Sequence, residues 1–399
     1  MTLKSVFLLT ILLSGYKIFM AQTPFPYEQT WQKIDSLIKE KGLPKSALEE
    51  VKKIHAAAKK EKQEGQWVKA VIYEEALQTG MDEDIAKARM QFEAEIQSAP
   101  PRVAALLKSL EAEQLYFYLQ RRRYRLTDRT EVKNDTSGDI STWTSGRLNK
   151  KIRELYLGSL INDSVLKQTD LTLFDAAILK GNARNLRPTL YDLLAYRALA
   201  FFENDDPEQP MAEDAFSMDD PAVFLPAARF REFSFKATDT SSNHLTALKI
   251  YQDLLKFHAE DAKPDALVDA DINRISFVNR YAAMPEKDSL YFSALELISG
   301  QYPFLPAAAQ AWYLQAAFFA RQAAAYDPTG DTSNRFGYVK AKAICEKVIS
   351  QKDSSEGKTN CSNLLNNITH KTFSLETEKV NLPGLPFRTL VTYKNVSHL

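Results

Sequence analysis

The apolar pattern of this chain changes period near Lys371, and that change limits the folds open to it. Before Lys371, apolar residues recur at helical spacing in stretches separated by proline, glycine or polar segments. After it, apolar residues take alternate positions: Phe373, Leu375, Phe387, Val391 and Tyr393. They flank a group of turn residues: Asn381, Pro383, Gly384 and Pro386. We therefore predict a mainly α-helical protein in which β-strands follow Lys371.

Two strands do not form a stable sheet by themselves in water, because one face of the sheet has to be buried. We therefore predict that residues 369–399 are the first β-strands of an incomplete β-sandwich, with Asn381 to Phe387 as the turn between two strands. The remainder of that sandwich would lie beyond Leu399.

An internal repeat is suggested by three alanines, Ala247, Ala294 and Ala341, which follow each other at intervals of 47 residues. Three positions before them stand His244, Tyr291 and Tyr338, and four positions after them stand Tyr251, Ile298 and Cys345. This pattern is similar to the second helix of tetratricopeptide hairpins. We predict an irregular helical-repeat region over 142–368; the alternative is a chance alignment of three amphipathic helices.

The N-terminus has the layout of a secretory signal peptide over residues 1–21. Lys4 precedes the apolar run 6–13, and Ala21 stands before the expected cut. The alternatives are an uncleaved anchor or a buried helix. We predict an exported protein, periplasmic or extracellular, with no membrane span once the signal is removed.

A helical region is predicted over 22–126. Its first helix carries one apolar stripe, made by Trp31, Ile34, Leu37 and Ile38. Ser46 is expected to cap the next helix, with Glu49 completing a capping box.

The 51 basic residues are balanced by 51 acidic ones, so the total charge gives no argument for nucleic acid as a partner, and we predict none. A local exception is the run from Arg121 to Arg125 at the end of a predicted helix. It could bind an acidic partner surface or phosphate, or simply complement the carbonyl end of that helix. Aromatic pairs such as Phe201-Phe202 and Phe318-Phe319 are expected to pack in the core rather than to line a groove.

The two cysteines, Cys345 and Cys361, stand in the last helical stretch. In an oxidising compartment they could form a disulfide. Closing a loop of about 15 residues would stabilise the fold by about 3 kcal/mol on the chain-entropy model. The alternative is two unpaired thiols.

No catalytic, cofactor-binding or metal-ligating motif occurs in the sequence. The histidines are scattered: His55, His244, His258, His370 and His398. There is no H-E-x-x-H, phosphate-binding glycine loop or G-x-S-x-G sequence. We predict a protein that is not an enzyme and that binds no cofactor. An exported enzyme is the least favoured alternative.

Two stretches resemble bacterial alpha-2-macroglobulin-like proteins of the long, exported type. The first comprises Trp31, 34–37 and 42–48, which is similar to the opening of these proteins. The second comprises 382–387 and 391–396, which is similar to the first strands of their first macroglobulin domain. The order of signal peptide, helical region and late strands also matches.

The resemblance implies an endopeptidase inhibitor that traps proteases, in which this helical region serves docking or spacing. Many members also bind covalently through a thioester in a C-x-E-Q motif. Here Cys345 precedes Glu-Lys-Val and Cys361 precedes Ser-Asn-Leu, so no thioester residue can be assigned. The alternative function is an exported helical-repeat module that binds a protein and has no role with proteases.

Overall fold

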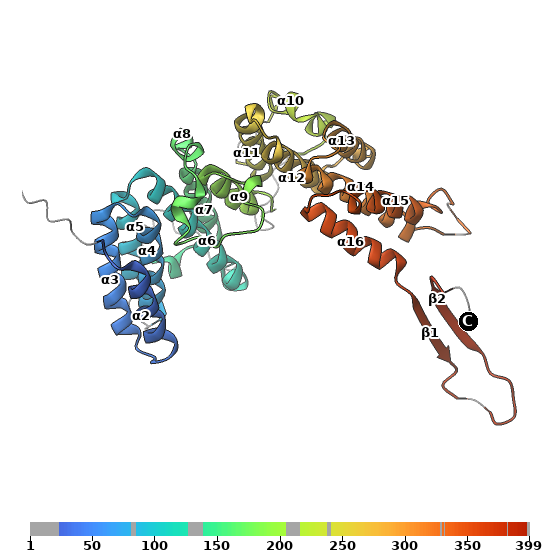
Figure 1. Cartoon of the computed structure of the whole chain (residues 1–399), viewed down its shortest axis with the longest axis horizontal. Helices are drawn as coiled ribbons and strands as arrows, with labels where there is room; N and C mark the ends of the chain where they lie inside the picture. The colour runs from blue at the N-terminus through green and yellow to red at the C-terminus, as the bar shows by residue number, and fades with distance from the viewer. Residues whose placement is uncertain are drawn as a thin grey trace, which may run out of the picture. The chain divides into compact units, whose positions relative to one another are not determined.

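The computed structural model describes residues 24–80, 85–126, 139–204, 216–237, 241–327, 329–330, 332–380 and 382–396. Within these ranges it contains 15 α-helices and one sheet of two strands (Figure 1). The predicted mainly helical class and the late strands are therefore confirmed, whereas a β-sandwich is not seen. The predicted signal peptide at 1–21, Asn381 and His398 lie outside the described residues. The predicted boundaries at 126, 142 and 368 stay predictions.

The chain divides into two compact units. The first comprises the described residues up to Ser98 together with Leu173–Ile178, and the second comprises Ala99–Thr172 and the chain from Leu179 onward. The first unit contains α2 (Tyr27–Lys39), α3 (Pro44–Glu61), α4 (Glu64–Gly80) and α5 (Ile85–Ser98).

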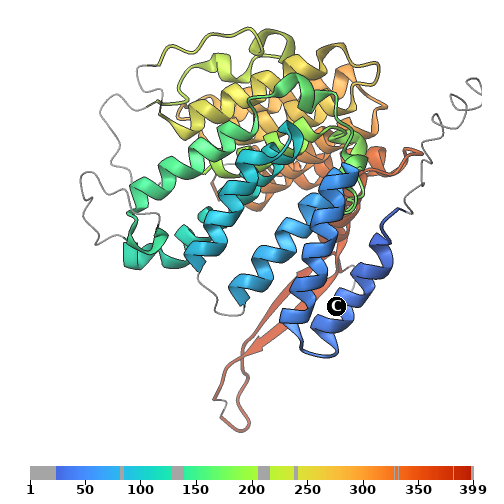
Figure 2. The same cartoon turned by 90° about the vertical axis from the view of Figure 1, so that its left-hand side faces the viewer.

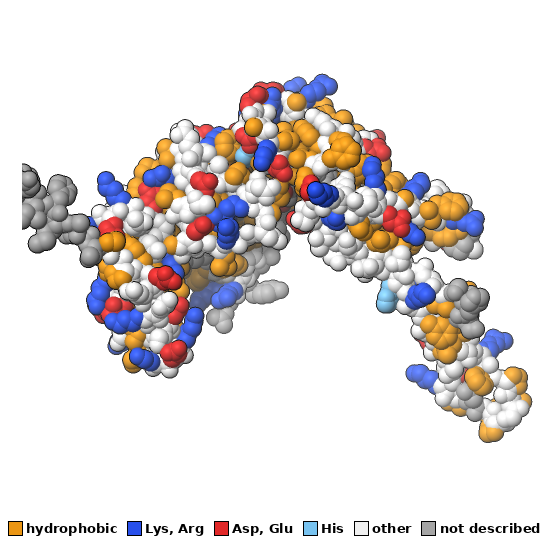
Figure 3. Space-filling model, viewed as in Figure 1, with side chains coloured by type: hydrophobic (Ala, Val, Ile, Leu, Met, Phe, Trp, Pro, Cys, Tyr) orange, Lys and Arg blue, Asp and Glu red, His pale blue; other side chains and the backbone are white. Residues whose placement is uncertain are grey.

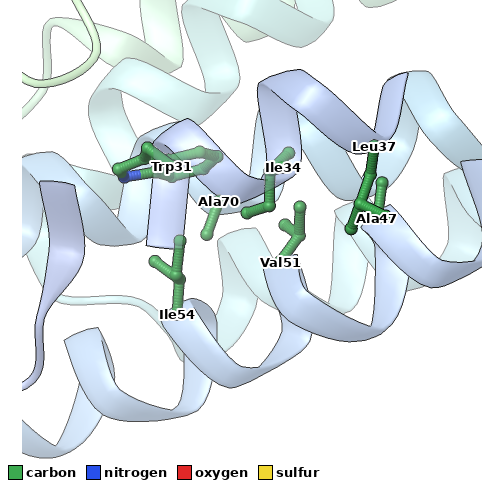
Figure 4. Packing of buried hydrophobic residues seen from close by; sticks show 7 residues of the cluster. All are labelled: Trp31, Ile34, Leu37, Ala47, Val51, Ile54 and Ala70. Carbon is green, nitrogen blue, oxygen red and sulfur yellow. The ribbon is translucent and has the colours of Figure 1, made fainter. Parts of the chain in front are cut away.

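The core of the first unit forms where α2, α3 and α4 meet (Figure 4). Its buried members are Trp31, Ile34, Leu37, Ala47, Val51, Ile54 and Ala70. The predicted stripe on α2 thus faces the core, with Ile38 packed at its margin. Burial of each large side chain contributes roughly 1.5–3 kcal/mol, which makes this cluster the main stabilising feature of the α2–α4 packing.

The predicted capping box at Ser46 is wrong. Helix α3 begins two residues earlier, at Pro44, and the side chain of Leu43 at the N-cap makes no capping hydrogen bond. Proline favours the first helical position because its φ angle already suits the helix and its missing N–H would have no intrahelical partner there. That preference prevailed over the Ser46 and Glu49 pattern.

The second unit contains the remaining helices: α6 (Pro101–Leu126), α7 (Ser145–Ser159), α8 (Asp163–Lys167), α9 (Leu190–Phe202), α10 (Ala227–Phe230), α11 (Asn243–Phe257), α12 (Asp265–Tyr281), α13 (Lys287–Gln301), α14 (Ala309–Ala324), α15 (Gly337–Ile349) and α16 (Glu356–Thr369). Short 3-10 turns include η4 (Pro221–Phe224) and η5 (His258–Glu260). The strands β1 (Thr372–Thr377) and β2 (Thr389–Lys394) follow α16.

The three repeat alanines fall on every second helix, α11, α13 and α15. Each of these helices packs against the next one along the chain. The positions four residues after the alanines are all buried: Tyr251, Ile298 and Cys345. The positions three residues before them differ, since Tyr291 is buried and Tyr338 is exposed. A helical array is thus present, and its relation to tetratricopeptide repeats stays a prediction.

Helices α14, α15 and α16 form a tight bundle directly before the strands. Its apolar centre includes Ala316, Ala341, Val348 and Ile368. Gly357 of α16 sits against the backbone of α14: a Cβ atom at this position would lie 2.2 Å from the carbonyl carbon of Ala309. Only glycine permits this approach of the two helices.

Candidate functional site

The candidate site is the hairpin formed by β1 and β2, which leaves its apolar side chains exposed. The strands are antiparallel, with Phe373 opposite Tyr393 and Leu375 opposite Val391. Because side chains alternate along a strand, these four residues share one face of the sheet. We call them the hairpin face. The other face carries mainly polar residues: Thr372, Ser374, Glu376, Leu390, Thr392 and Lys394.

The hairpin face is not covered by the described chain. Its side chains are between 38% and 57% exposed, and every residue of both strands is classed as exposed. The connecting loop adds further exposed apolar residues: Val380, Leu382, Leu385 and Phe387. Apolar side chains are visible along this part of the surface (Figure 3). Exposed apolar patches of this kind are typical of interaction surfaces.

The hairpin has a defined base and a defined turn. At the base, the Asn395 side-chain amide donates to the carbonyl oxygens of Ile368 (2.7 Å) and His370 (3.1 Å). The Lys394 ammonium donates to the carbonyl of Asn367 at 2.9 Å. The base is therefore tied to the last turn of α16, and the hairpin projects from there (Figures 1 and 2).

The predicted turn is confirmed within the loop. The N–H of Leu385 donates to the carbonyl of Leu382 at 3.2 Å, which closes a β-turn with Pro383 and Gly384 at its centre. Gly384 has φ +81°, a value that L-residues seldom adopt. In the described part of the chain the sheet has only these two strands, so the outer edge of each is available for pairing.

A buried histidine and two aspartates form a second cluster, which the sequence did not predict. The ring of His258 contacts Asp192 through Nε2 (2.7 Å) and Asp261 through Nδ1 (2.6 Å). Burial acts to lower the pKa of His258, but the hydrogen bonds and charges of the two carboxylates raise it above its usual value. Both ring nitrogens are occupied, so the ring has no free nitrogen for a substrate.

Asp192 has a structural role that explains this cluster. It accepts from the backbone N–H and the hydroxyl of Thr189 and so completes the capping box of α9. Its other oxygen holds His258, which follows α11. The cluster therefore joins the start of α9 to the end of α11.

A comparable cluster in the first unit is centred on His55. Its ring contacts Glu74 at 2.9 Å and Glu95 at 3.2 Å, and Lys59 donates to Glu95 at 2.8 Å. Burial opposes the charge on His55, but the bonds to Glu74 and Glu95 outweigh it and raise its pKa to about 9. Burial likewise acts to raise the pKa of Glu95, yet its bonds to His55, Lys59 and Trp67 lower it to about 2. Helices α3, α4 and α5 are joined by this network.

A cavity of about 270 Å³ lies between η4, α10, α12 and α13 in the second unit. Its walls are mixed, with Leu225, Ala294 and Leu297 among the apolar residues and Glu260 and Asp271 among the charged ones. Arg231 also lines it, and the Nε of Arg231 is buried without a hydrogen-bond partner. The Nε of Arg231 lies 3.6 Å from a carboxylate oxygen of the exposed Glu232. This cavity could accept a small apolar group with an adjoining hydrogen-bond acceptor.

The structure also places the arginine run and the aromatic pairs that the sequence suggested as candidate binding residues. The run Arg121 to Arg125 does lie at the end of α6, where Arg122 stacks over Tyr118. Phe201, Phe202 and Phe318 are buried, as predicted, whereas Phe319 is half-buried and packs at the margin of the α14–α16 cluster. In the described ranges, no three His, Cys, Asp or Glu side chains form a group that could hold a metal ion.

Cys345 and Cys361 are both fully buried in the α14–α16 bundle. They are unbridged thiols in this structure.

Comparison with known proteins identifies no relative. The chain matches no family model, no curated protein and no solved structure. Among the described residues, no helix combines the length and apolar character that a membrane crossing needs.

Proposed function

We propose that this chain is the exported, non-enzymatic N-terminal region of an alpha-2-macroglobulin-like endopeptidase inhibitor. In this proposal the helices provide docking or spacing, and β1 and β2 are the first strands of a macroglobulin-type β-sandwich. Protease trapping belongs to the full-length parent.

The uncovered hairpin face is the observation that carries the proposal. Two strands with a solvated apolar face are marginal in water, and further strands packed on that face would stabilise them. Burying the remaining exposed area of the four side chains would contribute roughly 1 kcal/mol for each. The resemblance of 382–387 and 391–396 to macroglobulin strands names the kind of domain that could supply those strands.

The test begins with the reading frame across the codon of Leu399. We expect it to continue into strand-rich sequence; a stop codon at that point would contradict the proposal. The longer product and the present chain are then compared by amide hydrogen exchange. We expect exchange in 372–377 and 389–394 to slow at least tenfold in the longer product, while exchange in α14 stays unchanged.

Trapping is tested with an endopeptidase and two substrates. A trapped protease should lose activity toward a large protein substrate but keep activity toward a small peptide, because only the small substrate reaches an enclosed active site. We expect this difference with the longer product and not with residues 22–399. Equal inhibition of both substrates, or of neither, would contradict trapping. Reproducible turnover of model peptides or esters would contradict the non-enzymatic assignment.

The cavity beside Arg231 favours a second candidate function, an exported helical-repeat module that binds a protein. A peptide side chain would fill the apolar part, and a carboxylate could accept from the buried Nε. Two variants distinguish these two candidate functions. Ala294→Trp, which fills the cavity, should abolish peptide binding only in the second case. Phe373→Ser should weaken packing on the hairpin face only in the first.

A further inference from the structure

The two cysteines of the chain meet in the bundle from which the hairpin projects. They are the only two among 399 residues and lie on consecutive helices, Cys345 on α15 and Cys361 on α16. Each has an exposed fraction of 0%. Cys345 stands on the buried side of α15 with Ala341 and Val348. Cys361 of α16 belongs to the same buried cluster, and α15 and α16 pack against each other.

We propose that Cys345 and Cys361 form an intramolecular disulfide that fastens α16 to α15. No third cysteine competes for the pairing, and both residues lie in the same buried cluster of the α14–α16 bundle. This inference rests on export, one part of the proposed function, because disulfides persist in oxidising compartments. It does not rest on protease trapping, since it concerns only the α14–α16 bundle.

The bond forms by thiol–disulfide exchange during folding. The two thiols lose two protons and two electrons and become one disulfide; the disulfide of an oxidoreductase or of oxidised glutathione accepts the electrons and is reduced to two thiols. In the folded state the hydrogen bond to Cys345, together with burial, raises the pKa of the Cys361 thiol. A neutral, buried thiol reacts slowly. The two thiols are therefore oxidised to the disulfide during folding, before α16 packs against α14 and α15.

The bridge would secure the helix that carries the hairpin. The base of the hairpin is bound to the last turn of α16 through Asn395 and Lys394. Without the bridge, α16 is held by non-covalent contacts only. These are its packing on α15, the close approach of Gly357 to α14, and the side-chain amide of Asn360, which donates to Gln310 of α14 at 3.0 Å. With the bridge, a pull on the hairpin passes through α16 to α15 by a covalent link.

Peptide mapping tests the bond directly. The chain is refolded with a mixture of reduced and oxidised glutathione, denatured, alkylated and cut with trypsin without reductant. We expect no alkylated cysteine and a linked pair of peptides, 343–347 with 359–371, that separates on reduction. Two alkylated cysteines, glutathione on either residue, or a bond between two chains would overturn the proposal.

Thermal unfolding tests the effect on the bundle. The bridged chain should melt roughly 5–10 °C above the same chain refolded under reducing conditions, because the closed loop limits the unfolded state. The variants Cys345→Ala and Cys361→Ala control for lost packing and should melt at one temperature in both conditions. If the wild type also melts at one temperature in both, the fastening of α16 is overturned.

Discussion

The helical part of the second unit and the hairpin that follows it differ in which side chains they bury. In the helices even charged side chains are buried: Arg274, Asp192 and His258 are at most 2% exposed. In the hairpin even Phe373 and Tyr393 are more than half exposed. The helices supply a partner for each of these three charged groups, whereas the hairpin leaves its apolar face to solvent.

This difference separates the part of the described chain that is stabilised by its own contacts from the part that is not. A buried guanidinium is tolerated only when its hydrogen bonds are made, and Arg274 makes them to Asp271 and to the carbonyl oxygens of Val223 and Leu225. An exposed apolar sheet face has no such compensation. The helices therefore compensate these buried charges with their own contacts, whereas no described residue covers the hairpin face.

The largest expected effect comes from removing the charge of Arg274. Arg274→Leu leaves Asp271 buried without its cation and two carbonyl groups without their donor. We expect the free energy of unfolding of the second unit to fall by roughly 3–5 kcal/mol, measured by urea titration. Arg321→Leu is the control, because its ion pair with Asp288 is long and solvated (3.6 Å) and should contribute less than about 1 kcal/mol. Equal losses in the two variants would contradict the contrast.

The second expected effect concerns the closeness of α14 and α16. Gly357→Ala places a methyl group 2.2 Å from a backbone carbon of Ala309 and forces the helices apart. We expect a loss of about 2–3 kcal/mol in the urea titration. Gly300→Ala on α13 meets nothing within 4 Å and should instead stabilise by roughly 0.5–1 kcal/mol. A stable Gly357→Ala variant would show that the bundle can relax.

The helices themselves were predictable because their apolar spacing is local. The spacing of Trp31, Ile34 and Leu37 predicts both that α2 forms and which of its faces is buried. The β pattern after Lys371 was equally local, and cross-strand pairing follows from the alternation and the turn at Gly384.

The buried polar clusters were not predictable in the same way. Asp192 and His258 are 66 residues apart, and no period in the sequence says which helices become neighbours. One usable signal existed for Arg274: it stands between the core residues Ile272 and Ile275, so a charged side chain had to lie close to the buried face. Asp271, three residues earlier, was its available partner.

A pH-dependent effect of intermediate size is expected in the first unit, where His55 faces Glu74 and Glu95, with Lys59 beside Glu95. The raised pKa of His55, about 9, means that its contribution is complete below about pH 6.5, the value for the unfolded chain, and is lost as the pH rises through 9. We expect a loss of about 1–2 kcal/mol between pH 6 and pH 9.5, reduced by the partial solvation of the ring.

The control for this prediction is His55→Gln, which cannot titrate. Urea titrations at both pH values should show the loss in the wild type and a smaller one in the variant. Equal losses in the two proteins would assign the pH dependence to other groups.

The smallest effect on stability is expected in the hairpin, and this makes it the sharpest test of the contrast. Phe373→Ser with Tyr393→Ser removes an exposed cross-strand pair, whose contribution is roughly 0.2–1 kcal/mol. The urea midpoint of the helices should therefore stay within error, while binding of an apolar dye to the surface falls. Leu295→Ser, at a fully buried position of α13, is the matched control and should lower the midpoint strongly. If the hairpin variant destabilises the helices as much as Leu295→Ser does, the hairpin face is packed against the helical scaffold in solution and is not free to receive a partner.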